Sequence, residues 1–340
     1  MRELAAQRRP QQIFHLAAQI DVRKSIEDPA WDAGINVVGT INVLEASRLA
    51  GVHRVVNTST GGAIYGETDV MPTPESVPPR PMSAYGQSKF CAEAYCGWYE
   101  RLYGLSSVTL RYGNVYGPRQ DPHGEAGVIA IFCGKLIAGG RPKIFGDGRQ
   151  TRDYAYVGDI VAANLAAAAH PEAHGAYNVG TGVEASVLEV VAALREAAGI
   201  GEGEFEPEFA AARAGELQRS SLDVTRARAE LGFAAETDYE LMTHLQPGRE
   251  NILALQARIG HGETSGSSRV GDFTISELVR GFRGSGGRSV PLRELAGIGL
   301  QQPGEGEERR AENRRLVLGE HAARRPEPDH GPGHGAGRET

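Results

Sequence analysis

The chain is 340 residues long and 40% hydrophobic, which is enough to build the core of one or two domains. Its net charge of −7 provides no basic surface for nucleic acid or for an anionic membrane, and no segment reads as a signal peptide or a membrane span. The three cysteines, Cys91, Cys96 and Cys133, have neither the spacing of a zinc site nor that of a disulfide framework. We therefore expect a cytoplasmic protein with no metal site and with neither a nucleic-acid nor a membrane partner.

The first sixty residues predict the end of a helix, a strand, a second helix and a second strand. Residues 1–10 have the pattern of a polar helix end, and residues 12–19 that of a strand followed by a turn of small residues. Apolar residues recur every three or four positions within 36–45, which predicts a helix, and Gly51 is placed to end it. Residues 52–60 run from β-branched side chains into hydroxyls, as a buried parallel strand does where its carboxyl end opens into a site.

A turn, a rigid loop and another helix are predicted after this strand. Gly61 and Gly62 allow the backbone to approach a ligand closely. Five prolines between residues 72 and 81 stiffen the loop that leads to a helix starting near Tyr85, and residues 108–112 predict the next strand. Strands that alternate with helices in this way indicate an α/β fold, with a parallel sheet covered by helices on both faces.

Tyr85 and Lys89 are four residues apart in the predicted helix, so their side chains project from one helix face. A nearby ammonium favours the phenolate and is expected to lower the pKa of the tyrosine, which makes it a usable general base. The spacing alone is common on solvated helix faces. Its interpretation depends on the hydroxyl-rich strand before it and on residues 111–118 after it.

These segments together resemble the extended short-chain dehydrogenase/reductases, most closely the NAD-dependent sugar-nucleotide epimerases of the UDP-glucose/UDP-galactose 4-epimerase type. The resemblance covers about residues 10 to 240. It implies a Rossmann-like doubly wound parallel sheet with a smaller α/β substrate domain, NAD as the cofactor, a UDP-sugar as the substrate and a homodimer. The implied parts are an NAD-binding domain at 1–120, a sugar-nucleotide part at 121–240 from which 155–182 returns to the sheet, and a non-family tail at 241–340.

The two ends of the chain depart from the family pattern. The strand, glycine-rich turn and helix that normally hold the cofactor pyrophosphate do not occur before Ile13. We therefore expect an amino-terminal truncation on the order of 60 residues and weak binding of NAD. Residues 241–340 contain no Lys, Tyr, Trp or Cys and are rich in Gly and Arg, which predicts disorder. An inactive fragment is accordingly an alternative to an active epimerase.

The resemblance also implies catalytic roles. Tyr85 takes the proton of the sugar 4-hydroxyl while the hydride at carbon 4 passes to NAD, and Lys89 keeps the phenolate charged and holds the nicotinamide ribose. Thr60, or alternatively Ser59, hydrogen-bonds the reacting oxygen, and Asn36 orients the lysine through water. The residues implied to contact NAD are Leu16, Ala17, Ala18, Gln19, Thr58, Tyr85, Lys89 and Tyr112.

The residues implied to bind the sugar nucleotide are Asn114, Phe145, Arg152, Arg213, Glu216 and Ser220. Phe145 would pack on the base and the two arginines would take the diphosphate, because a planar guanidinium bonds phosphate in pairs. The small side chain of Ser220 implies room for an N-acetyl group at sugar carbon 2. A dehydratase or decarboxylase of the same family is the alternative function, but those enzymes carry an acid in the segment that corresponds to 60–65, where this chain has none.

Overall fold

The computed structural model describes residues 1–117, 120–121, 127–201, 203–213, 216–236, 269–270 and 273–274. The chain divides into two compact units, Met1–Gly266 and Ser267–Thr340. In the second unit, β11 (Arg269–Val270) pairs antiparallel with β12 (Phe273–Thr274). Apart from these two strands, the tail predicted at 241–340 lies outside the described residues.

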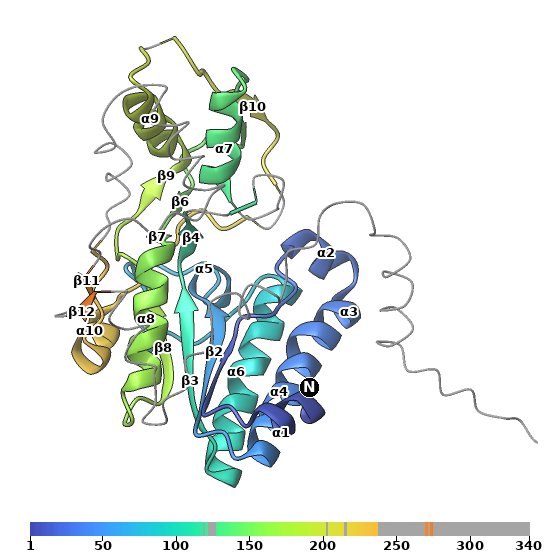
Figure 1. Ribbon diagram of the computed structural model, residues 1–340. Helices are drawn as coiled ribbons and strands as arrows, with labels where there is room; N and C mark the ends of the chain where they lie inside the picture. Colours follow the sequence, from blue (N-terminus) through green and yellow to red (C-terminus); the bar gives the residue numbers. More distant parts are fainter. Residues whose placement is uncertain are drawn as a thin grey trace, which may run out of the picture. The chain divides into compact units, whose positions relative to one another are not determined.

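A four-stranded parallel sheet forms the centre of the first unit (Figure 1). Its strands are β1 (Gln12–His15), β2 (Arg54–Thr60), β3 (Ser106–Tyr112) and β8 (Gly175–Val179), and they lie in that order across the sheet. The register pairs Thr60 with Tyr112, so the carboxyl ends of β2 and β3 lie together at one edge. The predicted α/β class with a parallel sheet is confirmed.

Helices precede and follow the strands in the expected alternation. The helices are α1 (Arg2–Arg8), α2 (Val22–Glu27), α3 (Pro29–Ala33), the π-helical turn η1 (Gly34–Val38), α4 (Gly39–Ala50), α5 (Gly61–Ile64), α6 (Ala84–Tyr103), α7 (Val128–Ile137), α8 (Val157–Ala169), α9 (Val187–Ala198) and α10 (Thr225–Leu231). Gly51 ends α4 in the left-handed region, at φ 68°, as predicted from its position. Ser83 starts α6 by accepting the backbone N–H of Gly86 at 3.1 Å, so the helix begins one residue before Tyr85.

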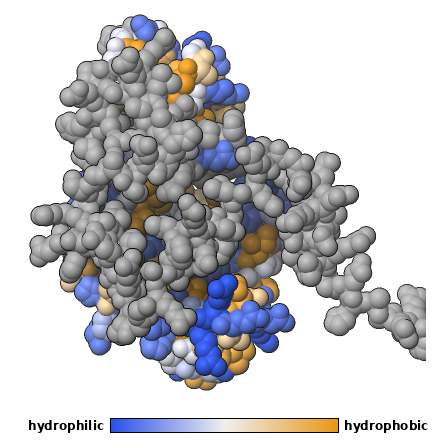
Figure 2. Space-filling model, viewed as in Figure 1, coloured by the Kyte–Doolittle hydropathy of each residue, from blue (hydrophilic) through white to orange (hydrophobic). Residues whose placement is uncertain are grey.

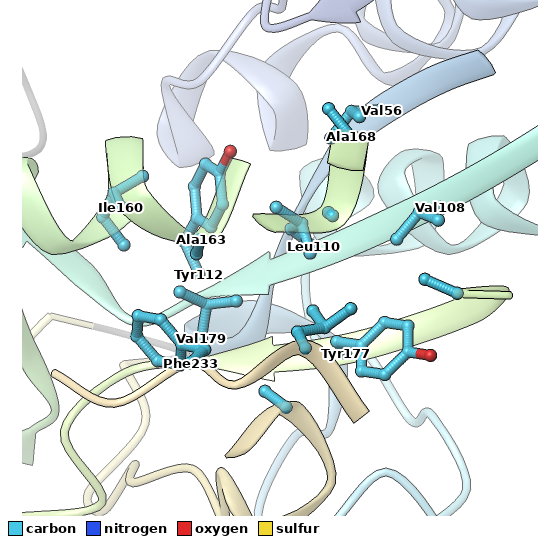
Figure 3. Close-up of a cluster of buried hydrophobic side chains, with 14 of the residues drawn as sticks. Val56, Val108, Leu110, Tyr112, Ile160, Ala163, Ala168, Tyr177, Val179 and Phe233 are labelled. Carbon is cyan, nitrogen blue, oxygen red and sulfur yellow. The ribbon is translucent and has the colours of Figure 1, made fainter. Parts of the chain in front are cut away.

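The two faces of the sheet bury separate cores. On one face α4 and α6 cover the strands with Leu44, Cys96 and Tyr99. On the other face a larger cluster joins the strands to α8 and α10, and Figure 3 shows Ile160, Ala163 and Ala168 of α8 gathered with strand residues and Phe233. Each fully buried aliphatic side chain contributes roughly 1.5–3 kcal/mol. The alternation of residues along β2 and β3 is what allows both faces to be buried.

A second group of elements lies beyond the carboxyl ends of the sheet strands (Figure 1). It comprises the pairs β4 (Asn114–Tyr116) with β7 (Tyr154–Tyr156), β5 (Lys143–Phe145) with β10 (Glu208–Ala210), and β6 (Thr151–Arg152) with β9 (Ala185–Ser186). Helices α7 and α9 pack on these strands around a core that includes Phe132, Ile144 and Leu194. Three of the predicted substrate residues, Asn114, Phe145 and Arg152, lie on these short strands.

Arg54 joins the start of β2 to the end of α8. Its buried guanidinium donates to the carbonyl oxygens of Ala167 at 2.7 Å, Pro171 at 2.6 Å and Ala173 at 3.1 Å, and also to that of His170. Some of these carbonyls belong to the carboxyl end of α8, where backbone carbonyls have no hydrogen-bond partner within the helix. A single side chain thus satisfies the end of α8 and the turn that follows it.

No helix within the described residues combines the length and the apolar character that crossing a membrane requires. Figure 2 shows polar and apolar residues interspersed on the coloured part of the face in view.

Candidate active site

The carboxyl end of β2 brings a threonine and a tyrosine together. Thr60 ends the strand, and its side chain hydrogen-bonds the side chain of Tyr85 in the first turn of α6. Ser59 lies on the opposite face of the sheet, because successive strand residues alternate. Ser59 is buried, and its Oγ has no hydrogen-bond partner among the residues that the structure describes. The geometry therefore favours Thr60 over Ser59 as the group beside Tyr85.

Lys89 lies one helical turn after Tyr85 and is 5% exposed. Its Nζ donates a hydrogen bond of 2.8 Å to the backbone carbonyl of Thr58. Burial lowers the pKa of Lys89 to about 8, while the charges of Asp32 and Glu93 act in the opposite direction. The ammonium is thus fixed to strand β2 at Thr58, two residues before the threonine that Tyr85 contacts.

The expectation that Lys89 lowers the pKa of Tyr85 is wrong for this structure. Burial raises the pKa of Tyr85 to about 12; the hydrogen bond with Thr60 opposes this shift and the charge of Asp32 adds to it. The physical reason is that the ammonium of Lys89 is directed at the Thr58 carbonyl, and desolvation of the phenolate outweighs the remaining attraction. At neutral pH the phenol is therefore in its protonated, proton-donating form.

Asn36 lies in the π-helical turn η1 and is 2% exposed. Its Oδ1 accepts from the backbone N–H of Gln19 at 2.9 Å, and its Nδ2 donates to the Gln19 carbonyl at 3.0 Å and to Asp32 Oδ1 at 3.0 Å. Single π-helical turns often mark functional sites. The side chain of Asn36 is thus used to hold the loop after β1 in place, and its predicted action on Lys89 through water stays a prediction.

Asp32 was not predicted from the sequence as a site residue. It is fully buried, and Oδ1 accepts hydrogen bonds from Asn36 Nδ2 and from Gln19 Nε2, the latter at 2.9 Å. The available signal was its spacing of four residues before Asn36, which places both on one helix face. A lone acid inside a helix is usually exposed, so this spacing alone does not distinguish Asp32 from a solvated acid.

The loop after β1 presents the residues predicted to contact NAD. Leu16 and Ala17 are exposed and Ala18 is half-buried, which leaves an accessible small-residue turn. Gln19 is different: its Nε2 donates to the Asp21 carbonyl at 2.8 Å and to Asp32, and its Oε1 accepts the Asp21 N–H. The Gln19 side chain is therefore occupied within the fold, as are its backbone N–H and carbonyl, which both bond Asn36.

Tyr112 is also held within the protein. Its hydroxyl accepts from Asn164 Nδ2 at 2.6 Å and lies 3.3 Å from Thr58 Oγ1. The ring belongs to the cluster of buried side chains beneath α8 (Figure 3). A direct contact between Tyr112 and NAD stays a prediction.

His15 ends β1 and contacts the helix that follows the π-helical turn. Its Nε2 lies 3.0 Å from Thr40 Oγ1, and that hydroxyl donates its one hydrogen to the Asn36 carbonyl at 2.7 Å. Thr40 must therefore accept from His15, which assigns the Nε2–H tautomer. Burial, with a smaller effect from Lys89, lowers the pKa of His15 to about 4.

The predicted substrate residues form two pairs. Arg152 Nη2 lies 3.4 Å from Glu216 Oε1. The guanidinium of Arg213 lies over the ring of Phe145, 3.9 Å from its centroid. Asn114, at the start of β4, is exposed, and its backbone N–H donates to the Asp153 carbonyl at 2.6 Å. An acid, two arginines and an aromatic ring are the groups that would contact a ribose, a diphosphate and a base.

Ser220 is 7% exposed and lies in the segment between Glu216 and α10. Two residues later, Leu222 packs against Gly61 so closely that a Cβ on Gly61 would lie 2.4 Å from it. The segment that carries Ser220 therefore rests on the turn that directly follows Thr60. Ser220 as the residue that sets substrate size stays a prediction.

Asp153 is a buried carboxylate that joins three parts of the chain, and the sequence reasoning missed it. It accepts hydrogen bonds from the N–H and Oγ1 of Thr181, both at 2.8 Å, from Gly182 N–H at 3.0 Å and from Leu222 N–H at 3.1 Å. Burial raises its pKa, and these bonds oppose that shift. Asp153 thus fixes Leu222, and with it the segment that contains Ser220. The sequence signal that could have identified Asp153 is its position directly after Arg152, a predicted substrate residue.

Arg111 forms a buried ion pair behind the site. Its guanidinium binds Glu93 of α6 with donor distances of 2.7 to 3.2 Å, and its Nη1 donates to the Tyr65 hydroxyl at 2.8 Å. Tyr65 in turn donates to Asn178 Oδ1 at 2.7 Å. Strand β3, helix α6 and the turn after α5 are held together by this chain of contacts.

Comparison with known proteins gives a consistent result. The family model described as the NAD dependent epimerase/dehydratase family matches residues 1–180. A protein of Mycolicibacterium smegmatis named UDP-glucose 4-epimerase is 50% identical over 230 residues, which are 68% of this chain and 72% of that protein. Crystal structures of UDP-glucose 4-epimerases from Thermotoga maritima with UDP-glucose and from Thermus thermophilus with NAD are each 41% identical, with TM-scores of 0.69 and 0.67, and each covers 74% of this chain and 80% of the other.

Proposed function

Because this chain belongs to the NAD-dependent epimerase/dehydratase family, we propose that it is an enzyme that interconverts the 4-epimers UDP-glucose and UDP-galactose. The observation that carries the proposal is the group formed by Tyr85, Thr60 and Lys89 at the carboxyl end of β2. The 50% identity to a relative named UDP-glucose 4-epimerase supports the same reaction.

The described residues fit the nicotinamide half of NAD. The Lys89 ammonium has three N–H donors, and one is given to Thr58, so two remain for a ribose hydroxyl or a water. The small-residue turn Leu16, Ala17 and Ala18 lies at the end of the neighbouring strand, where ligands bind in open α/β sheets. When bound, NAD supplies the reversible oxidation of the sugar at carbon 4.

Proton transfer is the task of this chain's own residues. Tyr85, a neutral phenol at the outset, first loses its own proton to solvent; its phenolate then takes the proton of the sugar 4-hydroxyl, and the phenol so formed returns that proton to the oxygen of the 4-keto sugar once the sugar has turned its other face. Thr60, hydrogen-bonded to Tyr85, orients the reacting oxygen. Lys89 places a positive charge behind the phenol, which favours its deprotonation during the oxidative half of the reaction.

Dehydration at carbons 4 and 6 is the second candidate, because dehydratases belong to the same family. Such a reaction moves a second proton and needs an acid close to Thr60. A side chain on Gly61 would lie 2.4 Å from Leu222, and one on Gly62 would lie 3.1 Å from Asn114 Oδ1. An acid at Gly61 would thus require Leu222 to move, and none of residues 60–65 is an acid, which favours the epimerase.

The experiment is to incubate the purified protein with NAD and UDP-galactose and to follow the anomeric proton signals by NMR. Epimerisation gives UDP-glucose, and the same equilibrium mixture must form from either sugar. A parallel reaction with dTDP-glucose tests for a 4-keto-6-deoxy product. Formation of that product without any UDP-glucose from UDP-galactose would replace the epimerase with the dehydratase.

A homodimer formed through α4 and α6 is part of the proposal. These two helices pack together and expose large apolar side chains, among them Leu49 on α4 and Trp98 and Leu102 on α6; Val38, at the end of the π-helical turn before α4, is exposed as well. Light scattering on the eluted protein is expected to give the mass of two chains. Leu102→Glu, which places a charge on this exposed face, is expected to give one chain.

We also infer a cytoplasmic location from the three free cysteines, of which Cys96 and Cys133 are buried. Fractionation of cells that express the protein tests this inference.

A further inference from the structure

Asp32 combines full burial with an unused acceptor. Its Oδ1 accepts from Gln19 Nε2 at 2.9 Å and from Asn36 Nδ2 at 3.0 Å. Among the residues that the structure describes, its Oδ2 has no hydrogen-bond partner. A carboxylate held out of water in this way costs free energy unless a cation or a water compensates it.

Lys89 is the cation that can compensate it. Helix α3, which carries Asp32, packs against α6, which carries Lys89 and Tyr85. The charge of Asp32 raises the pKa of Lys89 and also that of Tyr85. The other ionisable groups that act on Lys89 are Glu93 and Cys96 of α6, and His15 of β1 is itself affected by the lysine.

The neighbours of Asp32 also connect it to the rest of the site. Gln19 follows the turn at the end of β1, and Asn36 lies in the π-helical turn ahead of α4. Both side chains direct an N–H donor at the same oxygen, so the carboxylate holds these two segments together next to α6. An amide in place of the carboxylate could still accept these bonds through its oxygen, but it would carry no charge.

We propose that Asp32 is a positioning residue of this active site, which keeps Lys89 charged and holds the loop after β1 and the π-helical turn against α6. A water between Lys89 and Asp32 then donates the remaining hydrogen bond to Oδ2. This assignment rests on the proposed function, because the pair it supports is the pair that performs the proposed reaction.

The direct test uses the scarcity of lysine in this chain. The sequence contains four lysines, Lys24, Lys89, Lys135 and Lys143, so protein labelled with an NMR isotope at the lysine ε-carbon gives few signals. Lys89→Met identifies the signal of Lys89 by its loss. In Asp32→Asn the midpoint of the Lys89 titration is expected to fall by about 0.5–1 pH unit, with the other three unchanged. An unchanged midpoint for Lys89 in folded Asp32→Asn would overturn the proposal.

Asp21→Asn is the matched control. Asp21 is also a buried carboxylate of this network, and it starts α2 by accepting the N–H groups of Arg23 at 3.0 Å and Lys24 at 3.2 Å. It does not act on the pKa of Lys89 or Tyr85. The Lys89 midpoint is expected to stay in place in this variant; an equal fall in both variants would show a general loosening of the loop and would also overturn the proposal.

Two further measurements complete the test. In the active enzyme, Asp32→Asn is expected to move both limbs of the pH profile of kcat to lower pH, because it removes a negative charge that acts on Tyr85 and on Lys89. If Asp32→Asn does not fold, the unmodified protein still decides: a Lys89 midpoint near 8 supports the proposal, and one below about 7 contradicts it. Lysine titration requires no turnover, so a failure here is distinguishable from an absence of epimerase activity.

Discussion

The catalytic group and the substrate-binding residues are built differently. Around Tyr85, buried polar side chains are held by partners within the fold, as Asn36 is by Gln19 and Asp32. Around Arg152, the charged groups are more exposed and pair with one another: Arg152 with Glu216 at 3.4 Å, and Arg213 with the ring of Phe145 at 3.9 Å.

This difference follows from what each region does. A proton moves between fixed atoms, so the groups that move it must keep their positions through the reaction. A diphosphate and a ribose have to enter and leave, so their ligands gain from partners that a bound molecule can replace. Exposed pairs lose little when they open, because water takes over their hydrogen bonds. Four substitutions test how far this distinction extends.

Tyr85→Phe is expected to have the largest effect. It removes the proton-transferring hydroxyl and should lower kcat by about 10²- to 10⁴-fold, with the fold intact. Turnover of UDP-galactose and thermal unfolding are the two measurements. Tyr95→Phe, on an exposed turn of the same helix, is the control and should leave kcat unchanged. Near-normal turnover in Tyr85→Phe would remove this residue from the mechanism.

Glu93→Gln tests the buried network itself. It leaves the buried Arg111 guanidinium without its counter-charge, which is expected to cost about 3–5 kcal/mol of unfolding free energy. Glu208→Gln makes the same chemical change in the exposed pair with Arg141, which is 3.7 Å apart, and should change stability by less than about 1 kcal/mol. Urea unfolding of both variants gives the comparison; equal losses would show that burial does not distinguish the two regions.

His15 makes the catalytic end sensitive to acid. Its pKa is about 4 in the folded protein and 6.5 in the unfolded chain, so between these values the unfolded state binds more protons. Stability is therefore expected to fall as the pH drops from 6.5 to 4, by roughly 2–3 kcal/mol from this residue. His15→Gln should reduce that dependence in urea midpoints measured across this range. The exposed His53, changed to Gln, is the control that should leave it in place.

Ser220→Tyr is expected to have the smallest and most selective effect. If Ser220 leaves room at sugar carbon 2, a tyrosine there should reduce turnover of the N-acetylamino pair by about tenfold or more and spare UDP-glucose and UDP-galactose. Comparing kcat/KM for the two substrate pairs in both proteins measures this. Equal losses on both pairs would mean that Ser220 only packs against its neighbours.

The sequence predicted the framework well where periodicity and turn chemistry decide it. The strand ending in Thr60, the helix that begins near Tyr85 and the stop at Gly51 are all found in the structure. The contacts that determine the pKa values of Tyr85 and Lys89 could not be predicted from periodicity or turn chemistry. The direction of the pKa shift of Tyr85 depends on how deeply the phenol is buried and on which acceptor Lys89 selects, and both are decided by tertiary packing.

Residues that hold several segments of the chain together could not be predicted from the sequence either. Asp32 acts by meeting Gln19 and Asn36, and Asp153 by meeting Thr181, Gly182 and Leu222, up to 69 residues further along the chain. No local pattern distinguishes such carboxylates from the exposed acids that surround them in sequence. The substrate arginines could be selected because their chemistry matches a phosphate. Asp32 and Asp153 instead accept hydrogen bonds from other groups of this chain.

Arg54 has a consequence for how the native state is lost. Its carbonyl partners lie 113 to 119 residues further along the chain, so its contacts form only after α8 has ended and the chain has turned towards β8. Contacts between such distant residues are expected to be absent from an early transition state. An interaction of this kind slows unfolding while leaving the folding rate almost unchanged. We therefore expect Arg54 to lengthen the lifetime of the completed sheet more than it speeds its formation.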